Sequence, residues 1–204
     1  MNIIAVTGIF SGVGLIMFLL PPVPGLAVYL CAGVLLTPVC EDSMGGFWGA
    51  AIYSSFFAYI IKMIAHVMQQ KLIGECCGAT SVGVRAAVAI NSELMRTIRY
   101  ILEQRGISIA KVCIMCGGPD WPTSVLAGLL GANCCQCVLA LSPMLLCTTP
   151  ATLMGASKTK TGTLYDTLFQ VMTIMTLLTQ AGGMALMAYC LQQVYVKDKE
   201  AIEA

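Results

Sequence analysis

Two long stretches of this 204-residue chain are almost free of charge. Residues 1–40 contain no Asp, Glu, Lys or Arg, and residues 112–157 contain only Asp120. Charged residues make up 10% of the chain, whereas soluble domains carry about 25%. This pattern excludes a soluble enzyme, a secreted disulfide scaffold, a nucleic-acid-binding domain and a disordered tail. It predicts an all-α integral membrane protein forming a single membrane domain over residues 1–204.

Three apolar segments are long enough to cross a membrane. A helix needs about 20 residues to span a hydrocarbon core of about 30 Å. The third segment is longer than this, so it should tilt or protrude. Prolines 143 and 150 predict kinks in the second. The segments are Phe47–Met68, Asn133–Ala156 and a C-terminal helix over Leu164–Val196.

Two further apolar stretches are broken in the middle by proline and glycine. Prolines 21, 22 and 24 bar a continuous helix because each removes a backbone donor. Each flanking arm has about 10 to 12 residues, or roughly 15 to 18 Å, which is half a bilayer. We therefore expect two re-entrant helical hairpins. Their arms are residues 11–20 and 26–36 in the first, and 107–116 and 123–132 in the second. An alternative remains open, in which residues 2–20 form an ordinary span and 26–36 lie along the surface.

The hairpin tips are the predicted functional sites. Non-helical backbone at membrane depth is tolerated only where protein buries it or water reaches it. The tips are therefore expected to line a substrate pathway. The candidate pathway residues are Pro21, Pro24, Gly25, Pro119, Asp120, Trp121 and Pro122.

Asp120 and Trp121 each allow two interpretations. An ionised Asp at the bilayer centre costs about 2.5 to 3.5 kcal/mol, which favours a hydrated groove where Asp120 contacts a headgroup amine or a proton. Asp120 is alternatively a helix cap that accepts an N–H from Thr123 or Ser124. Trp121 is either an interfacial anchor, the favoured interpretation, or a plug at the tip.

The polar part of the chain is residues 69–111. Within it, residues 81–104 place apolar side chains on one helical face and charged ones on another, which predicts an interfacial amphipathic helix. Arg96 and Arg99 are its candidate headgroup contacts. A helix packed on its own protein is equally compatible with the pattern. The excess of basic residues places this segment on the cytosolic or equivalent side and the 157–162 turn opposite, although Lys158 and Lys160 in that turn oppose the assignment.

This topology predicts an inverted repeat. The first hairpin plus the Phe47 span, and the second hairpin plus the Asn133 span, would enter from opposite faces. Many transporters share this plan, with broken helices meeting near the midplane.

The eleven cysteines and the single histidine do not predict a metal site. A free Cys in an apolar stretch behaves as a small buried hydrophobe, and Cys113 and Cys116 form a C-x-x-C with no second such pair. His66 is expected to satisfy a backbone carbonyl rather than ligate haem or pigment. Nothing resembles a nucleophile–base pair or a phosphate loop. We therefore expect no enzyme activity, no metal and no cofactor.

The order of these features resembles the VTT domain, which defines the DedA family and its eukaryotic relatives. Phe18-Leu-Leu-Pro-Pro-Val-Pro-Gly25, followed by Gly45, Gly46 and Gly49, is similar to its first half. Gly117-Gly-Pro-Asp-Trp-Pro122 and the small residues 150–155 are similar to its second half. The resemblance covers about residues 10–156. It implies two re-entrant hairpins and movement of lipids, as scramblases or ion-coupled carriers.

Two departures from that pattern bear on mechanism. Ion-coupled members carry a carboxylate beside the first Pro-Gly and an arginine before the second-hairpin proline, where this chain has Leu26 and Cys116. The resemblance therefore implies scramblase-like lipid translocation without ion coupling. The alternative is a non-catalytic membrane subunit of a larger organellar complex. Expected partners are membrane lipids, and other membrane subunits or a second copy, with no nucleic acid. The expected location is an endomembrane or organellar membrane.

Overall fold

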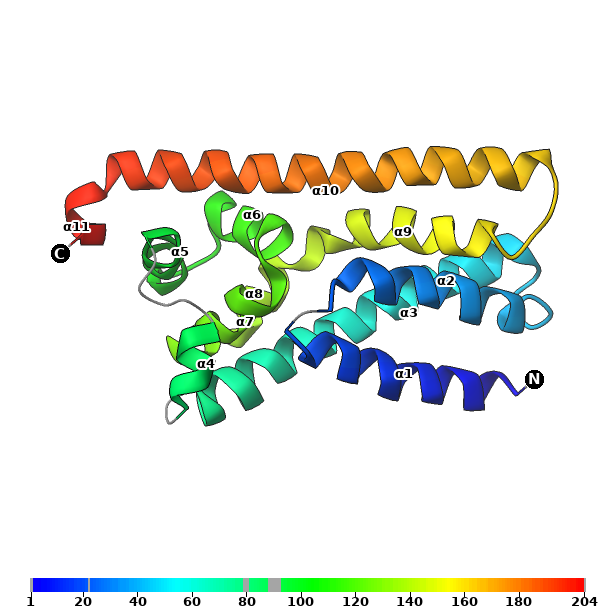
Figure 1. The fold of residues 1–204 in the computed structure, drawn as a ribbon, viewed down its shortest axis with the longest axis horizontal. Coiled ribbons are helices and arrows are strands. Elements are labelled where there is room, and N and C mark those ends of the chain that lie inside the picture. The colour runs from blue at the N-terminus through cyan, green and yellow to red at the C-terminus, as the bar shows by residue number, and fades with distance from the viewer. Residues whose placement is uncertain (1, 22, 79–80, 88–92, 204) are drawn as a thin grey trace. The chain divides into compact units, whose positions relative to one another are not determined.

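The computed structural model describes residues 2–21, 23–78, 81–87 and 93–203, and over these ranges it contains helices and no strands (Figure 1). They form two compact units, described separately below. The first unit comprises residues 1–65 and 144–180, and the second comprises residues 66–143 and 181–204. The α-helices are α1 (Ile3–Leu19), α2 (Gly25–Cys40), α3 (Phe47–Met68), α4 (Val82–Ala87), α5 (Glu93–Glu103), α6 (Ile109–Gly117), α7 (Asp120–Leu129), α8 (Cys134–Ala140), α9 (Leu145–Ser157), α10 (Thr163–Lys197) and α11 (Lys199–Glu203).

Three helical segments are long and apolar enough to cross a membrane, as the sequence predicted. α3 has the predicted bounds, but its helix continues as a π-helix, η1 (Gln69–Cys77). The second segment contains α8, a 3-10 turn over Ser142–Met144 that includes Pro143, and α9, which continues through Pro150. The third is α10, which continues unbroken through Gly182 and Gly183.

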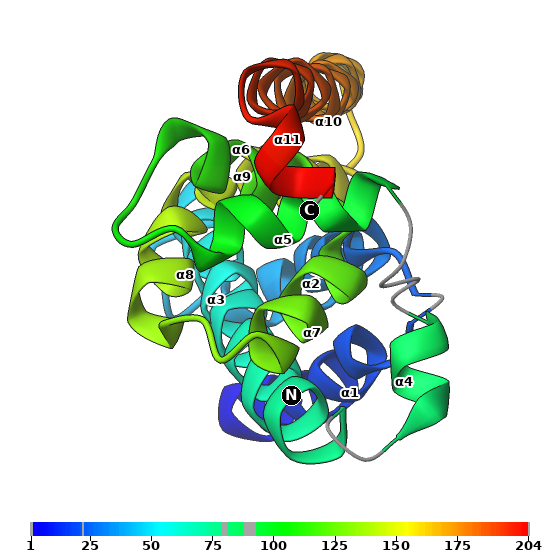
Figure 2. The same ribbon diagram turned by 90° about the vertical axis from the view of Figure 1, so that its left-hand side faces the viewer.

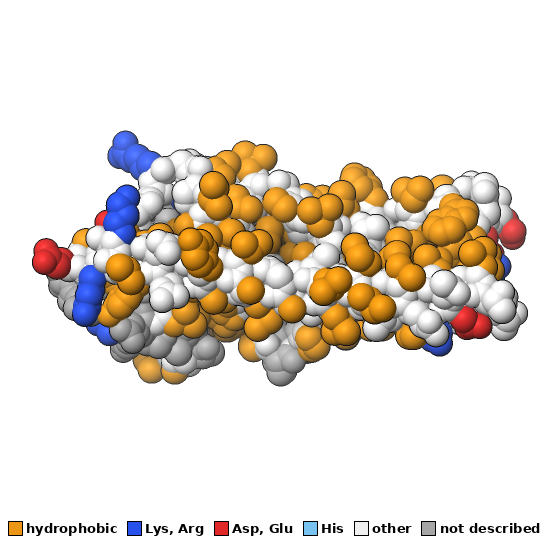
Figure 3. Space-filling view, turned by 90° about the horizontal axis from the view of Figure 1, so that it is seen from above, with side chains coloured by type: hydrophobic (Ala, Val, Ile, Leu, Met, Phe, Trp, Pro, Cys, Tyr) orange, Lys and Arg blue, Asp and Glu red, His pale blue; other side chains and the backbone are white. Residues whose placement is uncertain are grey.

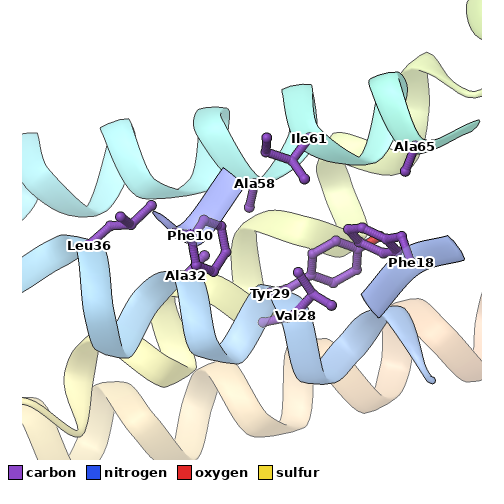
Figure 4. Close-up of a cluster of buried hydrophobic side chains, with 10 residues drawn as sticks. Phe10, Phe18, Val28, Tyr29, Ala32, Leu36, Ala58, Ile61 and Ala65 are labelled. Atoms are coloured by element: carbon purple, nitrogen blue, oxygen red, sulfur yellow. The ribbon is translucent and has the colours of Figure 1, made fainter. Parts of the chain in front are cut away.

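The first hairpin has longer arms than the sequence predicted. α1 has 17 residues and α2 has 16, so each measures about 25 Å rather than half a bilayer. Only the prolines at the tip interrupt the apolar run, and no charged residue shortens either arm. The arms are antiparallel, since Phe18 near the end of α1 lies 5.7 Å, between ring centroids, from Tyr29 near the start of α2 (Figure 4). These rings belong to the apolar core of the first unit, which also contains Phe10, Val28, Ala32, Leu36, Ala58 and Ile61.

The second hairpin agrees closely with its predicted arms. The Ser108 hydroxyl accepts the Lys111 N–H at the start of α6, and the Gly118 N–H donates to the Ile114 carbonyl at its end. α7 starts two residues later, at Asp120. The sequence places the break correctly because Gly118 and Pro119 act on their own backbone.

Much of the apolar face of α5 packs against its own unit. Ile98 and Ile101 are buried, and α5 contacts α6, α7 and α11 (Figure 2). Arg96 and Arg99 lie on its exposed side. The contacts of Ile98 and Ile101 favour the alternative of a helix packed on its own protein, while Leu94 on the same face is 46% exposed. Ile90 and Ser92, which the prediction also used, lie outside the described residues.

Glycines bring α2 and α9 into backbone contact in the first unit. A Cβ added at Gly33 would overlap the carbonyl oxygen of Thr152, and one at Gly155 would overlap that of Leu30. Neither position has room for a side chain, so the two helices pack directly on each other's backbone.

The second unit contains an equivalent contact between α7 and η1. A Cβ at Gly128 would overlap the carbonyl oxygen of Gln70, and one at Gly74 would lie 2.6 Å from that of Val125. In both units, therefore, a glycine on the second arm of a hairpin packs against a helix that carries a reciprocal glycine. In the first unit the partner helix α9 belongs to the second predicted span. In the second unit the partner η1 continues α3, which is the first predicted span.

Candidate functional site

The tip of the first hairpin is held by aromatic packing. Pro24 is the N-cap of α2, and Gly25 is its first residue. A Cβ at Gly25 would lie 3.1 Å from the ring of Phe18 and 3.2 Å from the hydroxyl oxygen of Tyr29. Any larger residue at Gly25 would push these two rings apart. Pro21 and Pro24 fall at the predicted tip.

A buried cation, Lys62, lies beside this tip. Its side chain on α3 is 0% exposed, and its Nζ lies 5.3 Å from the ring centroid of Phe18, within cation–π range. Charged residues inside membrane helices are rare and usually functional. Our sequence analysis missed Lys62, although a signal was present: it is the only Asp, Glu, Lys or Arg between Phe47 and Gln70.

Asp120 lies at the start of α7 in the second unit. Pro119 is the N-cap of the helix and makes no side-chain hydrogen bond, so Asp120 is the first helical residue. A carboxylate in this first turn interacts favourably with the helix dipole. The side chain is half-buried. This position is compatible with a pathway role and differs from the N-cap position that the alternative interpretation required.

Trp121 is buried, contrary to the favoured interpretation as an interfacial anchor. Its side chain is 8% exposed, whereas an anchor would present its ring to the lipid headgroups. Trp121 shares a face of α7 with Val125 and Gly128, and this face packs on η1. The Trp121 ring is therefore packed inside the second unit. Pro122 follows it in the first turn of α7.

His66 pairs with a hydroxyl near the second tip rather than with a backbone carbonyl. Its Nδ1 lies 2.8 Å from the Ser124 Oγ, which in turn donates to the Asp120 carbonyl oxygen at 2.9 Å. Because a serine hydroxyl has one proton, this arrangement requires His66 Nδ1 to carry a proton and donate it to Ser124. His66 is buried. One chain of hydrogen bonds therefore runs from the His66 imidazole through the Ser124 hydroxyl to the Asp120 carbonyl oxygen.

A buried glutamine extends the polar character of the second unit. The Gln70 Nε2 donates to the Ala132 carbonyl oxygen at 2.6 Å. Its Oε1 and the Thr123 Oγ1 are buried without a hydrogen-bond partner among the described residues. Buried polar atoms of this kind are usually satisfied by water or a ligand. Thr123, beside the second tip, therefore offers a polar group that a headgroup or water can engage, whereas Gln70 lies at the opposite end of α7.

Three further basic residues of the second unit have local partners or lie on the surface. The Arg99 Nε donates to Glu103 at 2.9 Å on the exposed face of α5, and Arg96 is exposed on the same helix. Lys111 is buried, and its Nζ donates to the carbonyl oxygens of Gln104 and Gly106 at 2.8 and 2.9 Å. Lys111 thus stabilises the chain just after α5.

The described residues contain no group of three or more His, Cys, Asp or Glu side chains placed to hold a metal ion. No protein-family model, curated protein or solved structure matches this chain, so the resemblance to the VTT domain rests on the residues quoted for it above.

Proposed function

We propose that this protein translocates phospholipids between membrane leaflets without ion coupling, in the manner of a VTT-domain scramblase. The observation that carries the proposal is that each hairpin tip is built beside buried polar side chains of the helix α3. The first tip has Lys62, and the second has His66 bonded to Ser124. A zwitterionic headgroup crossing a membrane needs such polar groups, because hydrocarbon supplies none.

Each tip carries a charge that can pair with one group of a phospholipid headgroup. Lys62, in the first unit, offers an ammonium to a phosphate, and Asp120, in the second unit, offers a carboxylate to an amine. The reciprocal glycine contacts, Gly33 with Gly155 and Gly74 with Gly128, support the inverted repeat that this function would use. Pro21, Pro24 and Pro119 would then provide the non-helical backbone at the tips, with Gly25 and Pro122 in the first turns of the helices that follow.

Asp120→Asn is expected to slow lipid movement by about tenfold, which corresponds to about 1.4 kcal/mol in the activation free energy. Asn has the same shape and is well tolerated at a helix start, so folding should persist. Dithionite quenching of a fluorescent phosphatidylcholine in proteoliposomes measures the exchange rate. Asp166→Asn, on the exposed first turn of α10, is the matched control. An unchanged exchange rate in Asp120→Asn would assign Asp120 a purely structural role.

The proposed topology places the 69–111 segment and the 157–162 turn on opposite sides of the membrane. The two turn lysines that opposed this assignment have local partners: Lys160 pairs with Glu41 at 2.6 Å, and the Lys158 Nζ lies 3.9 Å from the ring centroid of Phe169. In a background without reactive cysteines, Arg105→Cys and Thr161→Cys should react with an impermeant maleimide from opposite sides of sealed vesicles. Reaction of both from one side would contradict the topology.

A second candidate function, a non-catalytic subunit of a membrane complex, is favoured by α10. Almost none of the apolar stretch of α10 is buried, and hydrophobic side chains are exposed over much of the face shown in Figure 3. Lipid or another membrane helix can cover this surface equally well. Failure of the purified protein to exchange lipid, together with co-purification of a membrane partner from its native source, would select this function.

A further inference from the structure

A surface groove in the first unit lies at the opposite end of the hairpin from its tip. It has a volume of about 470 Å³ and is formed where α1 begins and α2 ends. This volume is within the range of small-molecule sites, about 300 to 1,000 Å³. Its walls combine apolar side chains, Ile3, Val34, Leu35 and Val39, with two polar ones, Asp42 and Ser43.

The polar end of the groove is negatively charged. Asp42 is exposed and forms no ion pair among the described residues, and it follows directly on the C-terminal end of α2, where the helix dipole favours a cation. Its neighbour Glu41 uses Oε2 to accept a hydrogen bond from Lys160, while the Glu41 Oε1 is buried without a partner in the described structure. The two carboxylates at this end, Glu41 and Asp42, therefore share Lys160 as a cationic neighbour.

Glu41 accepts the hydrogen bond from Lys160, whereas Asp42 interacts with Lys160 only through space. The hydrogen bond from Lys160 to Glu41 raises the pKa of Lys160 above its usual value. The pair therefore persists at neutral pH and is lost only as the pH rises through that raised pKa. Hydrogen bonds from the Ser43 and Met44 N–H groups to the Cys40 carbonyl, at 3.1 and 2.9 Å, fix the loop that carries Asp42.

An exposed tryptophan close to the groove in sequence favours a position at the level of the lipid headgroups. Trp48, at the start of α3 just after this loop, is 55% exposed, as expected of a tryptophan at a membrane interface. Val34 and Leu35, on α2, are about half exposed, so an acyl chain can lie against them. Charge, depth and apolar wall all match a phospholipid with a cationic headgroup.

We propose that this groove binds phosphatidylethanolamine, with the ammonium on Asp42 and an acyl chain along Val34 and Leu35. A primary ammonium donates charge-assisted hydrogen bonds to a carboxylate, whereas a choline has no N–H to donate. Choline is typically held by aromatic rings, and none occurs among the described residues that line the groove. The groove therefore selects ethanolamine over choline, and over the anionic headgroup of phosphatidylglycerol. This site is independent of lipid translocation.

Native mass spectrometry of the full chain in detergent tests the site. Phosphatidylethanolamine, phosphatidylcholine and phosphatidylglycerol with identical acyl chains are titrated separately. We expect the wild type to bind phosphatidylethanolamine about tenfold more tightly than the other two lipids, and Asp42→Asn to lose this preference. Asp166→Asn, an exposed carboxylate of the same unit outside the groove, should retain it.

Two further arms separate the groove from general charge. Val34→Trp, on the exposed wall, should weaken phosphatidylethanolamine binding while leaving Asp42 in place. Water-soluble glycerophosphoethanolamine should not compete at the lipid's binding concentration, because it lacks the acyl chains. Equal binding of the three lipids by the wild type, an unchanged preference in Asp42→Asn or an equal loss in Asp166→Asn would each overturn the proposal. Full competition by glycerophosphoethanolamine would also overturn it.

Discussion

Gly33→Ala is expected to destabilise the protein by about 3 kcal/mol, at the upper end of the usual cost of overpacking. The added Cβ would overlap the Thr152 carbonyl oxygen and lie 2.6 Å from the Ala156 backbone nitrogen. Neither atom can turn away as a flexible side chain can, so α2 and α9 must separate. For a chain of this size the loss corresponds to about 6 to 12 °C in the thermal midpoint, measured by circular dichroism in detergent.

The matched control is Gly182→Ala, in the interior of α10. A Cβ at Gly182 would meet no atom within 4 Å, so the intrinsic helix preference of Ala should raise stability by about 0.5 to 1 kcal/mol. Gly128→Ala, in the equivalent contact of the second unit, should behave like Gly33→Ala because its Cβ would overlap the Gln70 carbonyl oxygen. A Gly33→Ala midpoint equal to that of the wild type would show that α2 and α9 do not pack through backbone contact.

Lys62→Met is expected to reduce lipid exchange at least about tenfold, because it removes the one ammonium beside the first tip while keeping a long side chain. Lys62→Arg retains the charge and should keep a larger share of the rate. The measurement is the same fluorescent-lipid assay, with reconstitution efficiency and thermal midpoint recorded for each variant. Exchange at the wild-type rate in a folded Lys62→Met protein would remove Lys62 from the proposed pathway.

Stability and transport must be distinguished for this residue. Replacing a buried charge by an apolar side chain of similar volume is neutral or stabilising in some proteins, whereas breaking a buried pair costs about 3 to 5 kcal/mol. If Lys62 has only a structural role, stabilising the reconstituted Lys62→Met protein, for example by low temperature, should restore its exchange rate relative to that of the wild type under the same conditions. A pathway role predicts a persistent deficit.

The sequence by itself determined the features that depend on a residue's own backbone. The bounds of α3, the break at Gly118 and Pro119 and the interruption at Pro143 agree with the structure. Proline and glycine change the allowed dihedral angles and hydrogen bonds where they stand, and a predominantly apolar run of about 20 residues can be counted directly. These effects are local, so they can be predicted without knowing what packs against them.

The tertiary structure decided which side chains are covered. It buries Lys62 against Phe18, turns Trp121 inward and places Ser124 against His66. It also packs Ile98 and Ile101 of α5 against neighbouring helices, a choice that the pattern left open because an apolar stripe has the same periodicity whether lipid or protein meets it. The contacts of Gly33 with Thr152 and of Gly128 with Gln70 join residues far apart in the chain. No local pattern specifies such a partner, because the free energy of a close contact depends on both helices and appears only when they meet.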